Sequence, residues 1–277
     1  MVRFKLKHFI LIFMFFLYSF LTQSCNNDLW GLFSSTDIDE RLQERNNFTF
    51  LNTQPPLSIG SGNYSFIVLT DTHIEGGNAN GLEKLPAIVS ADSSIKFVVV
   101  VGDVTQNGAK EDIDKFIEIA KSLSVPIYPV IGNHDIYFGN WPVWKENIGS
   151  TSYKISEGNA ALFMLDSANA FYGKQQLDWL EGEMKLTNRD VFVFSHHNLF
   201  TEGLVNLQQT SSNYERARLT SILRNKCHIM FMGHSHKMQH NKVGGVEYIV
   251  IEDFKKTQTY CLVSVSSTGV IYEFKKL

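Results

Sequence analysis

Five polar clusters rich in histidine and aspartate interrupt the otherwise apolar runs of this chain. They are Asp71-Thr72-His73, Gly102-Asp103, Gly132-Asn133-His134-Asp135, His196-His197 and Gly233-His234-Ser235-His236. Imidazole nitrogens, carboxylates and amide oxygens, without thiolate, suit borderline divalent metals such as Zn, Mn, Fe or Ni. One ion would not need so many ligands, so the clusters predict a centre that holds two.

The spacing inside two clusters supports this prediction. Asp71 and His73 lie two residues apart, as do His234 and His236. An extended backbone points side chains at this spacing to the same side, so each pair can approach one ion. Gly and Asn are also ordinary turn residues, and a single cluster would be explained by a turn after a strand. Five similar strand ends favour a shared site.

The elements that must position the clusters alternate between strand and helix patterns, which indicates a layered α/β fold. Predicted strands span 65–70, 96–101, 126–131, 161–165, 191–195, 228–232, 247–251, 260–265 and 270–274. Predicted helices span 82–90, 112–123, 174–186 and 214–225, with a short one near 37–45. Each cluster directly follows a predicted strand. Open α/β sheets bind ligands at the carboxyl ends of their strands, so we expect the clusters to converge.

The ordered motifs D-x-H, G-D, G-N-H-D, H and G-H-x-H resemble those of the calcineurin-like metallophosphoesterase superfamily. The resemblance covers about residues 65–250, and the segment LFMLDSANAFYGKQQLDWLEGEM at 162–184 is similar to two further segments of that family. It implies a layered α/β sandwich of two mixed β-sheets flanked by helices. It also implies hydrolysis of phosphate esters, as a phosphomonoesterase or phosphodiesterase.

The resemblance also implies a set of metal ligands. One ion would be held by Asp71, His73 and His236, a second by Asn133, His196 and His234, and Asp103 would bridge the two. The family often has proline two residues after the fourth-motif histidine, and Asn198 stands there instead. The choice between His196 and His197 therefore stays open.

The implied mechanism uses two divalent transition-metal ions, Mn, Fe, Zn or Ni. A hydroxide that bridges the ions would attack phosphorus, and His134 would protonate the leaving oxygen as general acid. Asp135 would fix the tautomer of that histidine. Gln106 occupies the position where purple acid phosphatases have a tyrosine ligand, which argues against a tyrosinate-bound iron centre.

The first residues have the pattern of an export signal. Arg3, Lys5 and Lys7 precede an apolar stretch that begins at Phe9 and is short for a membrane span. The stretch ends at LTQSC, which resembles the lipobox of bacterial lipoproteins. We therefore expect an exported protein anchored in the cell envelope by lipid at Cys25, with a secreted or periplasmic form as the alternative.

Composition bounds the remaining possibilities. The chain is 44% hydrophobic and 19% charged, which is typical of one globular domain and excludes disordered and fibrous classes. The predicted organisation is a signal peptide at 1–24, a tether at 25–62 and a metallophosphoesterase domain at 63–277. The formal net charge of −3 gives no general attraction for nucleic acid, and the resemblance implies a small phosphorylated substrate. The alternatives are a non-catalytic metal-containing binding lipoprotein and an exported nuclease, which would need a basic groove.

Four other residues could bear on function. Cys227 and Cys261 lie in apolar segments, where they could pair in an oxidising compartment or stay as buried thiols. His228 is predicted to be a core strand residue, and His240 a surface loop residue. None of the four is assigned to the metal centre.

Overall fold

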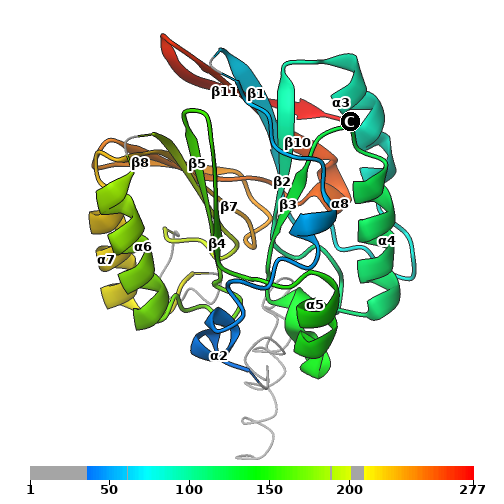
Figure 1. Cartoon of the computed structure of the whole chain (residues 1–277). Helices are drawn as coiled ribbons and strands as arrows, with labels where there is room; N and C mark the ends of the chain where they lie inside the picture. Colours follow the sequence, from blue (N-terminus) through cyan, green and yellow to red (C-terminus); the bar gives the residue numbers. More distant parts are fainter. Residues whose placement is uncertain (1–35, 61, 188, 201–208) are drawn as a thin grey trace, which may run out of the picture.

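Two β-sheets face each other, and helices cover the outer face of each (Figure 1). The structure is a computed structural model, and it describes residues 36–60, 62–187, 189–200 and 209–277. The strands are β1 (Tyr64–Leu69), β2 (Ile95–Val101), β3 (Ile127–Val130), β4 (Tyr153–Glu157), β5 (Ala160–Leu165), β6 (Asp190–Ser195), β7 (Cys227–Met232), β8 (Gln239–Val243), β9 (Val246–Val250), β10 (Thr259–Ser266) and β11 (Gly269–Lys276). The helices are α2 (Ile38–Leu42), α3 (Leu85–Ala91), α4 (Lys110–Lys121), α5 (Trp141–Asn147), α6 (Lys174–Leu186), α7 (Asn213–Leu223) and α8 (Phe254–Thr257), with 3-10 turns η2 (Leu51–Thr53), η3 (Leu82–Lys84) and η4 (His134–Gly139).

Both sheets mix parallel and antiparallel strands. The first has the order β11-β10-β1-β2-β3, in which β1, β2 and β3 are parallel. The second has the order β4-β5-β6-β7-β9-β8, in which only the edge strands β4 and β8 pair antiparallel. Parallel strands are buried on both faces, which explains their continuous apolar sequences. The predicted α/β sandwich with two mixed sheets flanked by helices is confirmed.

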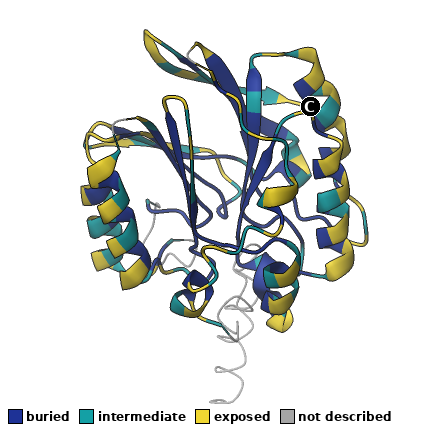
Figure 2. Ribbon diagram, viewed as in Figure 1, coloured by how far each residue is buried: buried dark blue, intermediate teal, exposed yellow. Residues whose placement is uncertain are grey.

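The core consists of three apolar layers, because successive side chains of a strand point to opposite faces. In β1, Phe66 points between the sheets, whereas Ile67 points toward the helices that cover the first sheet. The ring of Phe66 stacks 4.5 Å from that of Phe97 and lies edge-on 5.0 Å from that of Phe192 in the opposite sheet. These contacts join the sheets through their centre. Figure 2 shows the central strands of the sheets buried, whereas the edge strand β11 and the outer sides of the helices are exposed.

Each predicted strand is present, but two strands were not predicted. These are β4 and β8, both of which are edge strands with partly exposed polar side chains. An edge strand has one exposed side and needs no apolar run, so its sequence resembles that of a loop. The predicted helices 112–123, 174–186 and 214–225 correspond to α4, α6 and α7.

The segment before β1 packs on the domain through α2. Arg41 of this helix is fully buried, and its Nε and Nη2 atoms lie 2.7 and 3.0 Å from the two carboxylate oxygens of Asp166. Of the expected tether at 25–62, the part from Thr36 onward therefore contacts the domain core. Cys25 and the expected signal peptide lie outside the described residues. None of the helices in the described ranges has the length and apolar character of a membrane span.

Candidate metal centre

The five clusters follow β1, β2, β3, β6 and β7, and the structure brings them together between the two sheets. The backbone N–H of His234, after β7, donates to Asp71 Oδ2 after β1 at 3.1 Å. His196 Nε2, after β6, lies 3.1 Å from Asp103 Oδ2 after β2. Both contacts join a loop of one sheet to a loop of the other. The expected convergence at the carboxyl ends of the strands is thus observed.

Three groups of side chains have the geometry to hold an ion, and in each group the ligand atoms lie within 4.8 Å of one another. Asp103 belongs to two of them, as a bridging carboxylate would. The groups are Asp71 with His73 and His236, His73 with Asp103 and His134, and Asp103 with His196 and His234. The first and third groups reproduce the two histidine and aspartate ligand sets that the sequence implied.

Asn133 is the remaining residue of the second expected ligand set, which it would complete through its amide oxygen. Its Nδ2 donates to the hydroxyl of Tyr137 at 2.6 Å, which leaves Oδ1 as the other polar atom of the side chain. Within the described residues, Asn133 Oδ1 is buried without a hydrogen-bond partner, and so are both ring nitrogens of His73. Buried polar groups are nearly always satisfied, so such a set requires an explanation. Cations at this position would satisfy Asn133 Oδ1 and one ring nitrogen of His73, so the side chains fit the metals that the sequence predicted.

The electrostatics of the centre also suit cations. Burial opposes ionisation of Asp71 and Asp103, but His196 and the other nearby histidines outweigh it and hold the pKa of both carboxyls below the usual range. Burial, together with repulsion from His196, lowers the pKa of His234 to about 3. Burial opposes protonation of His196, but the Asp103 and Asp71 carboxylates outweigh it and raise its pKa to about 9, so a bound cation would have to displace a proton from that ring.

The backbone of the ligand loops is unusual. Five candidate ligands have positive φ angles between 44° and 66°, namely Asp71, His73, Asp103, His234 and His236. This region is uncommon for residues other than glycine, and such residues cluster at functional sites. A side chain at Gly132 would overlap the Asp103 carboxylate, which explains the glycine that precedes Asn133. The extended backbone that we expected at Asp71–His73 and at His234–His236 is therefore not observed, and local strain and close approach accompany the convergence of the candidate ligands.

His134 lies at the edge of the centre, and one of its ring nitrogens is hydrogen-bonded to the backbone. Its Nδ1 lies 2.6 Å from the backbone carbonyl of Gln106, and its Nε2 lies 3.9 Å from Asp103 Oδ2. The ring is perpendicular to that of His73 at 4.6 Å and packs against Tyr137 at 4.4 Å. The side chain is 15% exposed, whereas that of His196 is fully buried. A group at the mouth of the centre could therefore reach His134.

Asp135 does not make the contact that we expected. Its carboxylate accepts hydrogen bonds from the backbone N–H groups of Val104, Thr105 and Gly132, at 3.2, 2.8 and 2.9 Å. Burial and the charge of Asp103 raise its pKa to about 7. Asp135 thus joins the loops after β2 and β3. His134 Nδ1 contacts the Gln106 carbonyl, where we had expected the Asp135 carboxylate.

The structure distinguishes the two adjacent histidines of the fourth cluster. His196 belongs to a metal group, whereas His197 belongs to none of the groups found among the described residues. The His197 ring packs 4.0 Å from the ring of His234, and its backbone N–H donates to Ser167 Oγ. His197 thus lies behind the ligands rather than among them.

Two side chains that contact the ligands were missed by the sequence analysis. Tyr137 holds the amide of Asn133, and Asp253 Oδ2 lies 3.2 Å from Nδ1 of His236. Tyr137 follows the third cluster closely and could have been considered for that reason. Asp253 lies in no cluster, and nothing in the sequence marks it.

The remaining candidates lie away from the centre. Cys227 and Cys261 are both buried free thiols. The prediction that His228 is a core residue is wrong: its side chain is 43% exposed and pairs at 2.8 Å with Asp190, the first residue of β6, because it lies near the start of β7. His240 is 51% exposed, as predicted, but it lies in the edge strand β8 and not in a loop.

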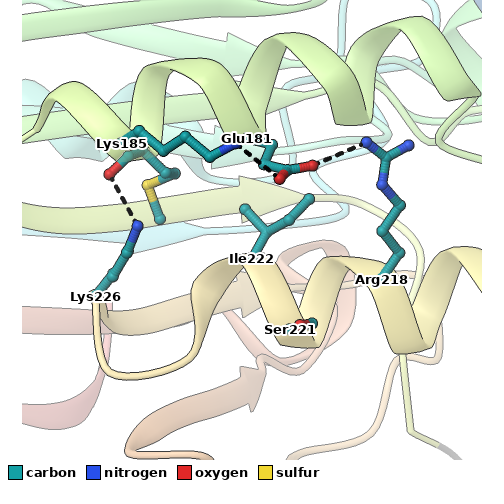
Figure 3. A pocket seen from close by; sticks show the side chains of 7 residues that line it. Glu181, Lys185, Arg218, Ser221, Ile222 and Lys226 are labelled. Atoms are coloured by element: carbon teal, nitrogen blue, oxygen red, sulfur yellow. Dashed lines mark hydrogen bonds and ion pairs between the residues drawn. The ribbon is translucent and has the colours of Figure 1, made fainter.

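A groove of about 190 Å³ between α6 and α7 contains charged side chains but none of the candidate ligands (Figure 3). Glu181 pairs with Lys185 at 3.0 Å and with Arg218 at 3.1 Å. Lys226 Nζ donates to the backbone carbonyl of Met184 at 3.3 Å. The Glu181–Arg218 pair joins the two helices, and Lys226 joins the segment after α7 to α6, so we assign this groove a structural role.

Comparisons with known proteins agree with the geometry. Residues 64–238, more than half of the chain, match the family model described as calcineurin-like phosphoesterase. A probable glycerophosphodiester phosphodiesterase from Arcobacter nitrofigilis is 29% identical over 155 residues, which are 51% of this chain and 56% of that protein. A probable cyclic nucleotide phosphodiesterase from Fibrobacter succinogenes is 28% identical over 149 residues, 51% of this chain and 58% of that protein. The chain thus spans little more than half the length of these two relatives.

Solved structures show the same fold. The crystal structure of a dimetal phosphatase from Danio rerio superposes with a TM-score of 0.62 at 15% identity, covering 77% of this chain and 96% of that one. The structural likeness, the family model, the ordered clusters and the shared position of Asp103 all support the same family assignment. The chain belongs to the calcineurin-like phosphoesterase family.

Proposed function

We propose that the protein hydrolyses phosphate esters with two divalent metal ions. Asp71, His73 and His236 would hold one ion, Asn133, His196 and His234 the other, and Asp103 would bridge them. The observation that carries the proposal is that Asp103 lies in one group of ligand atoms with His73, a candidate ligand of the first ion, and in another with His196 and His234, candidate ligands of the second. When bound, two such ions activate water and neutralise charge on the phosphoryl oxygens.

His134 is the residue that we propose to donate a proton to the leaving oxygen. The carbonyl of Gln106 accepts the Nδ1 proton at 2.6 Å, and this fixes the ring so that Nε2 faces the centre. A leaving alkoxide is a poor group unless it is protonated, so a positioned imidazole accelerates its departure. The hydrogen bond from His134 Nδ1 to the Gln106 carbonyl fixes the tautomer of the ring, so the Asp135 carboxylate is not needed for that role.

Phosphodiesters are the substrates that we propose to test first. The two relatives described above are named as probable phosphodiesterases, and their names support a diester for this chain. The acidic net charge favours a small substrate over nucleic acid. We also propose that lipid at Cys25 anchors the protein in the cell envelope, on the strength of the basic and apolar leader that precedes LTQSC.

The test is metal content measured together with turnover. Purified protein loaded with Mn²⁺ or Zn²⁺ should contain about two ions per chain and hydrolyse bis(4-nitrophenyl) phosphate or 4-nitrophenyl phosphate. Asp103→Asn should lose both properties together. The matched control is Asp114→Asn, because Asp114 is exposed on α4 and pairs with Lys110. Two bound ions with no turnover of either ester would favour the non-catalytic alternative, and fewer than two ions would refute the dinuclear centre.

A further inference from the structure

Asp253 carries a buried carboxylate, and the usual role of an aspartate at the start of a helix does not explain why this carboxylate is buried. It precedes α8 at the N-cap position and is 2% exposed. Aspartate at this position usually accepts a hydrogen bond from the first amides of the helix, but the Asp253 side chain makes no such bond. Its Oδ2 instead lies 3.2 Å from Nδ1 of His236, and within the described residues neither of these two buried atoms has another hydrogen-bond partner or a hydrogen bond of ideal geometry to the other.

The backbone holds Asp253 in this place. The N–H of Phe254 donates to the carbonyl of Thr70 at 3.0 Å, and the N–H of Lys255 donates to the carbonyl of Asp71 at 3.1 Å. The first turn of α8 is therefore joined to the end of β1, beside a candidate ligand. A group that orients a ligand is effective only when its own position is rigid, and these two bonds provide that rigidity.

The ring of His236 has a carboxylate at each nitrogen. Its Nε2 lies 3.1 Å from Asp71 Oδ1 inside the metal group, and its Nδ1 faces Asp253. A histidine that binds a metal gives one nitrogen to the ion, and the proton on the other is usually accepted by a carboxylate or carbonyl. The side chain is 18% exposed, so burial alone does not fix its orientation.

We propose that Asp253 positions His236 by accepting the Nδ1 proton, which directs Nε2 to the ion that Asp71 and His73 share. This inference rests on the metal-dependent function proposed above. Lys256 Nζ also lies 3.1 Å from Asp253 Oδ2, but its side chain is 64% exposed, so solvent screens this pair. The contact with His236 is therefore the one that links Asp253 to the metal centre.

The first experiment measures metal affinity without substrate. Titration of the full chain with Mn²⁺ or Zn²⁺ against a competing chelator should show two binding events in the unmodified protein. Asp253→Ala should weaken one of them by about 10–100-fold. Asp253→Asn keeps an acceptor for the Nδ1 proton and should lose less. Glu252→Gln is the control, because that carboxylate is one residue away and faces Thr259 Oγ1 at 3.3 Å; its affinities should not change.

A double-mutant cycle separates positioning from a general structural effect. In a His236→Ala background, Asp253→Ala should change the weakened affinity less than about 3-fold, because the ring that it orients is gone. An equal loss in both backgrounds, or no loss in the unmodified background, would overturn the proposal. If circular dichroism shows that Asp253→Ala does not fold, Asp253→Asn is compared in the unmodified and His236→Ala backgrounds instead.

The outcome can be distinguished from a failure of the proposed function. If two ions bind but no ester is hydrolysed, the proposed hydrolase function is refuted. The double-mutant cycle of metal affinities would still test the role of Asp253. Normal turnover in the unmodified protein, with metal affinity unaffected by Asp253→Ala, would refute only the positioning role.

Discussion

Replacement of His134 by alanine tests whether this side chain transfers a proton or holds a metal. The structure supports proton transfer because Nδ1 is 2.6 Å from the Gln106 carbonyl and Nε2 is 3.9 Å from Asp103 Oδ2, which is longer than a hydrogen bond. Loss of a positioned general acid slows a reaction by roughly 10²–10⁴-fold. At about 1.36 kcal/mol per tenfold, this corresponds to about 2.7–5.5 kcal/mol of transition-state stabilisation.

The assay compares two leaving groups and counts metals in the same preparation. His134→Ala should retain about two ions per chain, because the other ligand groups stay intact. An alkyl ester should lose more activity than a nitrophenyl ester, since nitrophenolate departs without a proton. The control is His240→Ala, which removes an imidazole that is 51% exposed and pairs with Glu247. That variant should keep both activities.

Two results would contradict this reasoning about His134. Loss of one ion from His134→Ala would make the side chain a ligand, as its group with His73 and Asp103 permits. Retention of both ions with equal slowing of alkyl and nitrophenyl esters would show that His134 positions the phosphoryl group. In either case the Gln106 carbonyl would orient the ring for a purpose other than proton donation.

Three further predictions concern the ligand amide, the buried ion pair and the leader. Tyr137→Phe keeps the ring but removes the hydroxyl that accepts from Asn133 Nδ2, so the affinity for one ion should fall about 10-fold in a chelator titration; unchanged affinity would show that the amide needs no such support. Arg41→Met leaves the buried Asp166 carboxylate without its two-bond partner and should lower the free energy of unfolding by about 3–5 kcal/mol in urea, with part of the loss recovered by adding Asp166→Leu; a cost below about 1 kcal/mol contradicts the burial argument. Cys25→Ala should abolish incorporation of a fatty-acid label and release the protein from membranes, and an unaltered membrane fraction would refute lipid attachment.

The sequence determined the clusters that could bind metals because their signal is local, and the family resemblance implied which residues in them would be ligands. Each cluster follows an apolar strand directly, and the residue types are those that bind metals. The fold class could be predicted for the same reason, since strands buried on both faces have continuous apolar sequences. The edge strand β8 could not be predicted, because its side chains are partly exposed and polar.

Only the tertiary structure decided which groups support the ligands. The Gln106 carbonyl beside His134 is a backbone group. Because every residue has one, the identity of residue 106 could not predict this contact. Asp253 contacts His236 only because α8 is joined to the end of β1 through backbone hydrogen bonds. The expectation for Asp135 failed for a related reason: adjacency to His134 in the sequence does not direct its carboxylate, which the backbone N–H groups of other loops attract instead. Ligand identity is a property of local sequence, whereas ligand orientation depends on contacts between distant segments that form only when the two sheets pack.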